Sequence, residues 1–382
     1  MRFLKLFSAA IFSFTMSAAT PEKLTVYIGT YTGGPSKGIY AYEFNTTSGA
    51  LKQIGLAAET PSPSFLAIHP NGKLLYAVNE LDNYGGEKHG AITGYKIDPS
   101  NPAKLTKINE ATSKGAHPCH IIVDKAGQHV LAANYTGGNV VVYPIDAEGK
   151  LGDKPISFVQ HRGSSVNQSR QKEAHAHSLN LDADQRFAFV ADLGLDKIMI
   201  YRYGQGSPGT LVPNEPDSAS IKPGGGPRHL AFTPDGKRAY VNHEMTGHIT
   251  GFNYDSAKGT LTEFQTISTL PGGNPVPGNS TAEILVHPSG KFVYCSNRGH
   301  NSIAAFTVAT DGKLTYVENE STRGKTPRNF NIDPSGKFLI AANQDSDTLA
   351  VFKIDPTTGA LDPVGDTVPA PKPVCIKFYA GK

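Results

Sequence analysis

The stretch PSFLAIHPNGKLLYAVNE, residues 63–80, carries the pattern that decides the fold. Apolar residues alternate along a first segment, a Pro-Asn-Gly-Lys turn follows, and a second alternating segment ends at Asn79. Period-two alternation broken by a Pro/Gly turn is typical of a β-hairpin. Close variants of this unit begin at residues 118, 176, 227, 281 and 327. The chain is therefore built from one repeated hairpin unit.

A seventh copy of the hairpin is divided between the two ends of the chain. Residues 373–378 supply only a first strand, and residues 26–30 supply only a second strand. Each complete unit is followed by two more alternating segments, so a unit holds four strands and spans about 46 to 58 residues. These features predict an all-β, seven-bladed β-propeller with four-stranded blades. Pairing of the N- and C-terminal strands within one blade closes the ring.

The first 19 residues have the features of a secretory signal peptide. A positively charged start is followed by a short apolar stretch and the small residues Ser17-Ala18-Ala19. The stretch is too short to span a bilayer, and we expect no membrane span after cleavage. We therefore expect residues 20–382 to form a single propeller domain that is exported, either to the periplasm or outside the cell. An N-terminal membrane anchor is the alternative interpretation.

Charge and cysteine content exclude several other classes of protein. The formal net charge is only +3 and no basic stripe is present, so we expect no nucleic-acid partner. The three cysteines, Cys119, Cys295 and Cys375, are scattered and form neither a disulfide framework nor a CxxC metal motif. Cys119 and Cys375 both fall at strand starts and could pair, but buried free thiols are the favoured interpretation.

Hairpin geometry determines which residues meet at one end of the ring. Residues before the first strand and after the second lie opposite the hairpin turn, and the first strand is the innermost of its blade. These positions therefore surround one mouth of the central channel. Long connections are expected on the same face; they are residues 82–89, 161–174, 217–226 and 272–280.

Charged and imidazole side chains gather at these rim positions, while the strands between them stay similar. They are His177, Arg228, Glu244, Glu283 and Arg298, together with Glu80, His175, His229 and Arg328. Such divergence within a uniform repeat indicates a functional site. A network of rim salt bridges that binds no substrate is the alternative interpretation. The recurrent Asn79, Asn134, Asn297 and Asn343 are expected instead to cap the turn after the second strand.

A metal site is a further alternative for the same mouth. His175, His177, His229, His243 and Glu244 include enough nitrogen and oxygen ligands for a divalent ion. However, alternate residues of an extended chain point to opposite faces, which disfavours joint chelation by His175 and His177. We therefore assign no metal ligand and no cofactor, and metal dependence stays open.

The motifs HAHS (175–178), GPRH (226–229), NHE (242–244), AEI (282–284) and SNRG (296–299) resemble those of the lactonase family of seven-bladed propellers. That family includes a bacterial 6-phosphogluconolactonase and a fungal carboxy-cis,cis-muconate cycloisomerase. The resemblance covers almost the whole mature chain. By motif position, the His, the Glu and the two Arg proposed for the cycloisomerase site fall on His177, Glu244, Arg228 and Arg298.

The resemblance implies a lactone hydrolase with these four groups as catalytic residues. His175, His229, Glu283, Arg328 and Glu80 are then expected to bind the substrate, a small sugar lactone such as 6-phosphogluconolactone or a related gluconolactone. His177 or Glu244 could activate water, and the arginines could hold the oxyanion. We expect a monomer. The alternatives are a cycloisomerase that forms a lactone and a non-catalytic propeller that binds a ligand or a protein.

Overall fold

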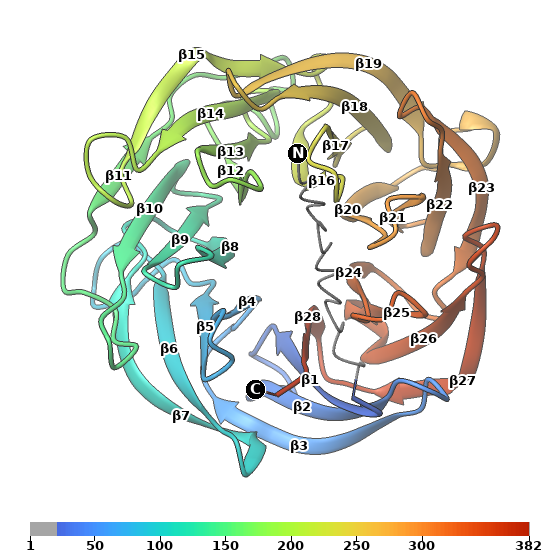
Figure 1. The fold of residues 1–382 in the computed structure, drawn as a ribbon, viewed down its shortest axis with the longest axis horizontal. Helices are drawn as coiled ribbons and strands as arrows, with labels where there is room; N and C mark the ends of the chain where they lie inside the picture. Colours follow the sequence, from blue (N-terminus) through green and yellow to red (C-terminus); the bar gives the residue numbers. More distant parts are fainter. Residues whose placement is uncertain (1–20, 382) are drawn as a thin grey trace, which may run out of the picture.

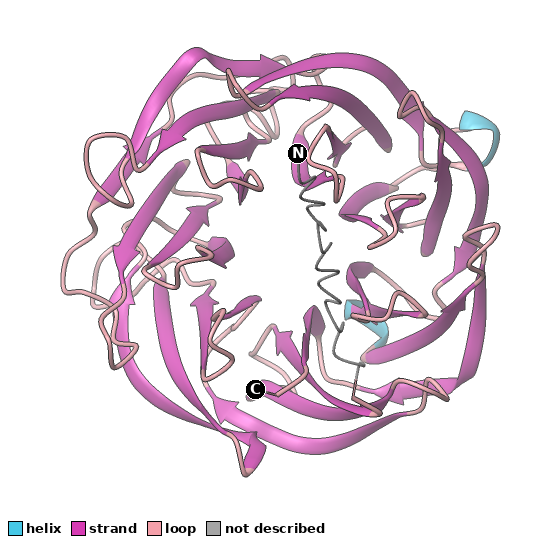
Figure 2. Ribbon diagram, in the orientation of Figure 1, coloured by secondary structure: helices cyan, strands magenta, loops and turns pink. Residues whose placement is uncertain are grey.

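The computed structural model describes residues 21–381 and contains seven antiparallel four-stranded sheets arranged in a ring (Figure 1). Helix within the described residues is limited to two short 3₁₀ turns, η1 (Pro271–Gly273) and η2 (Gln344–Ser346), as Figure 2 shows. The predicted all-β, seven-bladed β-propeller is therefore confirmed. The expected signal peptide, residues 1–19, lies outside the described residues.

The seven blades follow one another along the chain, and the strands of each blade are named from the innermost to the outermost. Blade 1 contains β28 (Pro373–Tyr379), β1 (Lys23–Thr30), β2 (Gly38–Asn45) and β3 (Leu51–Glu59). Blade 2 contains β4 (Phe65–Ile68), β5 (Leu74–Asn79), β6 (Ala91–Asp98) and β7 (Asn101–Thr112). Blade 3 contains β8 (Pro118–Val123), β9 (His129–Asn134), β10 (Asn139–Pro144) and β11 (Ser157–Gln160). Blade 4 contains β12 (Ala176–Leu181), β13 (Phe187–Asp192), β14 (Lys197–Tyr203) and β15 (Leu211–Ser220).

The last three blades repeat this order. Blade 5 contains β16 (Pro227–Phe232), β17 (Arg238–His243), β18 (His248–Asp255) and β19 (Thr260–Ser268). Blade 6 contains β20 (Ser280–Val286), β21 (Phe292–Arg298), β22 (Ser302–Val308) and β23 (Leu314–Ser321). Blade 7 contains β24 (Pro327–Ile332), β25 (Phe338–Asn343), β26 (Thr348–Ile354) and β27 (Leu361–Pro369). Each innermost strand contacts the innermost strands of the adjacent blades.

Blade 1 closes the ring by joining the two ends of the described chain. Strand β28 pairs antiparallel with β1, with Phe378 opposite Val26 and Ile376 opposite Ile28. The pairing satisfies backbone groups that would otherwise leave an open sheet edge beside the central strands. The predicted closure within one blade is therefore confirmed.

Hydrogen bonds between blades add to their apolar packing. A tyrosine on the second strand of several blades donates to a carbonyl oxygen in the outer turn of the next blade. These bonds are Tyr76 to Gly149 (2.8 Å), Tyr240 to Gly312 (2.6 Å) and Tyr294 to Gly359 (2.8 Å). Each of these tyrosine rings is buried among apolar side chains between two blades. The bond at the blade edge gives its hydroxyl group a hydrogen-bond partner, so the hydroxyl is not buried unpaired.

The role expected for the recurrent asparagines is found only in part. Their Nδ2 atoms donate to the connection that enters their own blade, as in Asn79 to Pro61. Within the described residues, only two of these Nδ2 atoms also bond across the following turn, Asn134 to Asn139 at 2.7 Å and Asn343 to Thr348 at 3.4 Å. The connection expected at 217–226 begins only after Ser220, because β15 continues along β14 with Ser218 opposite Met199.

All three cysteines are buried free thiols, which excludes a Cys119–Cys375 bond in this structure.

Candidate active site

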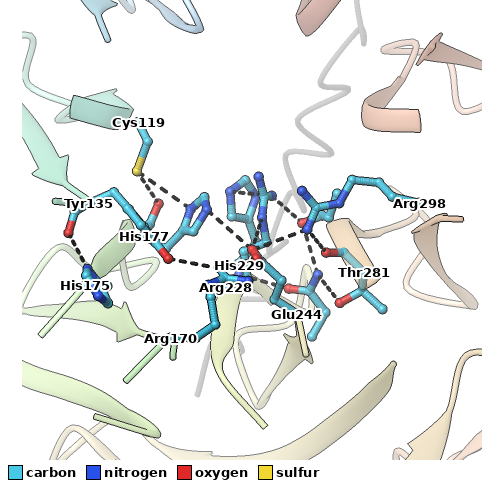
Figure 3. A network of polar contacts seen from close by, with 12 residues as sticks. Cys119, Tyr135, Arg170, His175, His177, Arg228, His229, Glu244, Thr281 and Arg298 are labelled. Atoms are coloured by element: carbon cyan, nitrogen blue, oxygen red, sulfur yellow. Dashed lines mark hydrogen bonds and ion pairs between the residues drawn. The ribbon is translucent and has the colours of Figure 1, made fainter. Parts of the chain in front are cut away.

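Rim residues from the second to the seventh blade converge on one cavity of about 430 Å³ at a mouth of the channel. Its lining residues are Glu80, Cys119, Tyr135, Arg170, His177, Glu244, Arg298 and Arg328. Most of these side chains are drawn in Figure 3, where they point toward one another from different blades. The structure therefore brings together five of the nine expected site residues: Glu80, His177, Glu244, Arg298 and Arg328.

Irregularities at the start of the innermost strands aim several rim side chains. The register of the first two strands shifts at this point in each of blades 3 to 7. The residues inside the shifts are Cys119, His177, Arg228 with His229, Ala282 with Glu283, and Arg328. A bulge breaks the strict alternation of faces and re-aims a side chain. The strands thus stay regular for packing while their first residues face the channel.

Glu244 is the centre of the charged cluster. Its Oε1 is 2.7 Å from Nη2 of Arg170, and its Oε2 is 3.0 Å from Nε of Arg228 and 3.3 Å from Nη2 of Arg298. Burial opposes ionisation, but the charges of Arg298 and Arg228 and the hydrogen bond from Arg170 outweigh it and lower the pKa of Glu244 to about 2. Glu244 is therefore an anion that orients three guanidinium groups, and its carboxylate is only a weak proton acceptor.

His177 is the other expected base and lies beside this carboxylate. Its Nε2 is 3.7 Å from Oε2 of Glu244, which is too long for a hydrogen bond. Burial, followed by the positive charges of Arg228 and His229, holds its pKa well below 6.5. The imidazole is therefore neutral near pH 7, so one of its ring nitrogens can accept a proton.

Arg228 lies at the inner end of the cluster, backed by a buried chain of polar groups. Its Nη1 donates to the carbonyl oxygen of Ala282 at 2.5 Å and lies 3.2 Å from Nε2 of His229. Nδ1 of His229 in turn lies 2.7 Å from Oε1 of Glu283. His229 and Glu283, expected to bind substrate, thus do not line the 430 Å³ cavity but stand behind Arg228.

A second anion-attracting group lies across the cavity. The Arg328 guanidinium is 5.3 Å from the ring centroid of Tyr31, and the Tyr31 hydroxyl donates to Glu80 at 2.9 Å. Arg328 forms no ion pair or hydrogen bond within residues 21–381, in contrast to the three arginines around Glu244. The cavity holds three arginines and two glutamates in its lining, with Arg228 directly behind, so positive charge predominates.

Arg170 and Tyr135 line the cavity although they were not among the expected site residues. Arg170 lies in the connection between blades 3 and 4, and its Nη2 donates to the Tyr135 hydroxyl at 3.0 Å as well as to Glu244. The connection formed by residues 161–174 was expected on this face because of its length. That length was the only feature of the sequence that pointed to Arg170. His175 stacks on Tyr135 with ring centroids 4.5 Å apart and does not line the cavity.

The connection that carries Arg170 is anchored at several points. Nδ1 of His161 is 2.6 Å from Oδ2 of Asp192, and Ser165 donates to Asp196 at 2.6 Å. These bonds fix the connection against blade 4 and hold Arg170 over the cavity. Within residues 21–381, no three His, Cys, Asp or Glu side chains are grouped so that they could hold a metal ion.

Comparisons with known proteins identify the family of the chain. A family model described as lactonase, 7-bladed β-propeller, matches residues 25–378. The 6-phosphogluconolactonase of Bacillus subtilis is 38 % identical over 353 residues, covering 92 % of this chain and 97 % of that protein. The 6-phosphogluconolactonase of Formosa agariphila is 35 % identical over 340 residues, covering 88 % and 94 %. The solved structure of the periplasmic gluconolactonase of Pseudomonas aeruginosa superimposes with a TM-score of 0.87 at 33 % identity, covering 94 % of this chain and all of that one.

Proposed function

Since this chain belongs to the seven-bladed β-propeller lactonase family, we propose that it hydrolyses the ring ester of a sugar lactone in the cavity at its channel mouth. The observation that carries the proposal is that neutral His177 and Arg298 line one cavity, with Arg228 directly behind them. Ester hydrolysis needs a proton acceptor for water and positive charge for the oxyanion, and this cluster supplies both.

The reaction then follows from the placement of these groups. His177 takes a proton from water as the water oxygen attacks the lactone carbonyl carbon. Arg298 stabilises the negative charge that develops on the carbonyl oxygen, Arg228 adds positive charge from directly behind, and Glu244 keeps both guanidinium groups aligned. The tetrahedral intermediate breaks its ring C–O bond, and the protonated His177 returns its proton to the departing oxygen. The product is the open-chain hydroxy acid.

The charge of the cavity favours an anionic lactone as substrate. Arg328 has no carboxylate partner within the described residues, so it is available for a substrate phosphate or carboxylate. We therefore place 6-phosphogluconolactone first and unphosphorylated gluconolactone second. This choice agrees with the names of the Bacillus and Formosa relatives.

We also propose that the protein acts outside the cytoplasm, after loss of residues 1–19. The support is the signal-like sequence of that segment and the periplasmic location stated for the Pseudomonas gluconolactonase. No helix among residues 21–381 is long and apolar enough to cross a membrane. Fractionation of cells that make the full chain tests this directly: the processed protein is expected in the periplasmic or extracellular fraction.

The test of the activity is a panel of lactones given to purified mature protein. The panel contains 6-phosphogluconolactone, glucono-δ-lactone and a muconolactone, each with and without EDTA. Opening of at least one sugar lactone above its spontaneous rate is expected. Turnover of the muconolactone alone would favour the cycloisomerase activity, and no turnover of any lactone would favour a binding propeller.

A further inference from the structure

A second cavity of about 170 Å³ lies farther along the innermost strands, towards the hairpin turns. It is separated from the candidate active site by a constriction of about 10 Å³, which is lined in part by Phe65, Arg228 and His229. That space is about the size of one water molecule, so a sugar cannot pass through it. A sugar bound in one cavity therefore does not reach the other through this space.

The hydrogen-bond acceptors that line this second cavity are largely occupied by protein donors. Oε1 of Glu283 accepts from the imidazole of His229 and the backbone N–H of Ile284, and Oε2 accepts from Nδ2 of Asn329 at 2.5 Å. The side-chain oxygen of Asn329 accepts from the backbone N–H of Ile376. The only carboxylate among the lining residues is thus held by three donors.

Donors in the same cavity are left without partners. Nδ1 of His120 accepts from the backbone N–H of Leu179 at 3.3 Å, so its proton is on Nε2, for which no partner exists within residues 21–381. The ammonium of Lys377 lies 4.6 Å over the ring of Phe65 and forms no ion pair within residues 21–381.

We propose that this second cavity is a binding site for a small inorganic anion, such as a halide or phosphate. The charge of Lys377 and the N–H group of His120 would face it, with the apolar Ile122, Leu230 and Phe330 completing the wall. Lys377 is half-buried and, within the described residues, its ammonium has only the Phe65 ring as a partner, so a bound anion would add electrostatic stabilisation. The site is distinct from the lactone cavity and independent of the activity proposed for it.

Bromide and inorganic phosphate are the probes for this site. Crystals of the wild-type protein grown without halide are soaked in bromide, and anomalous scattering locates the ion. A bromide peak within hydrogen-bond distance of Lys377 Nζ is expected. Calorimetric titration with phosphate follows, with Arg328→Met present in every sample so that the phosphate contact proposed for the candidate active site does not contribute. It compares the protein with Lys377, Lys377→Met and the control Lys125→Met, which removes an exposed lysine at the same end of the propeller.

Lys377→Met is expected to weaken the phosphate binding assigned to this cavity at least tenfold, while Lys125→Met leaves it unchanged. The variant Lys377→Arg keeps the charge and is expected to keep binding, which separates loss of charge from loss of folding. Only water beside Lys377 in bromide-soaked wild-type crystals would overturn the proposal. Equal phosphate affinities with Lys377 and with Lys377→Met would do so as well.

Discussion

Replacing Glu244 with glutamine tests the electrostatic centre of the candidate site. The carboxylate faces three guanidinium groups at 2.7, 3.0 and 3.3 Å, and its side chain is only 7 % exposed. Its pKa is about 2 in the folded protein against 4.5 ordinarily. That difference corresponds to about 3 kcal/mol of folding free energy contributed by the charged form.

The sign of the pH dependence follows from the lowered pKa. Because the folded protein binds this proton less readily than the unfolded chain, the stabilisation is fully present above pH 4.5. It is lost as the pH falls from 4.5 towards 2. Glu244→Gln lacks this dependence, so the variant should be less stable than wild type by about 3 kcal/mol at pH 7 and the gap should close with acid.

Denaturant unfolding of wild type and Glu244→Gln at pH 7, 4.5 and 3 measures this gap. The variant should also lose about 10²–10³ in kcat, since Arg228 and Arg298 are no longer aligned. Glu263→Gln serves as the control, because Glu263 is exposed and accepts a hydrogen bond from Thr266 away from the cavity, so it should change neither the pH dependence of stability nor kcat. A stability gap that stays constant from pH 7 to pH 3, or that is absent at pH 7, would refute this reasoning.

The remaining predictions concern His177, Arg328, the metal question and the blade contacts. Because burial holds the pKa of His177 well below 6.5, kcat/KM should stay level as the pH is lowered from 8 to 6.5; a fall centred near 6.5 would contradict this. Arg328→Met should raise KM for 6-phosphogluconolactone with little effect on glucono-δ-lactone, and equal losses would refute a phosphate contact. EDTA should leave the rate unchanged, and loss restored by a divalent ion would assign a metal. Tyr294→Phe removes one bond between blades and should lower the unfolding free energy by about 1 kcal/mol, whereas Tyr316→Phe, at an exposed ring, should not.

The repeat in the sequence was sufficient for the fold because a propeller is defined by local hairpins. Alternation fixes each strand, and the split seventh unit fixes the closure that β1 and β28 make. The ends of the strands were harder to predict from the sequence. Strand β15 continues to Ser220 because it pairs with β14 there, and this pairing cannot be read from the composition of the segment.

The candidate site was predictable only as far as hairpin geometry reaches. That geometry placed His177, Glu244 and Arg298 at one mouth, where the structure has them. It could not show that Glu283 and His229 turn behind Arg228, because this depends on the register shifts at the starts of β16 and β20. Arg170 was beyond reach as well, since its place depends on the anchored course of a long connection.

The most direct test of the central claim is kcat/KM for 6-phosphogluconolactone, measured by acid release in a pH-stat with wild type and His177→Gln. The matched control is His300→Gln, which changes an imidazole that does not line the cavity. If His177 accepts the proton of the attacking water, the kcat/KM of its variant should fall by about 10²–10⁴, while the control keeps the wild-type value. Wild-type turnover that persists in His177→Gln would contradict the account.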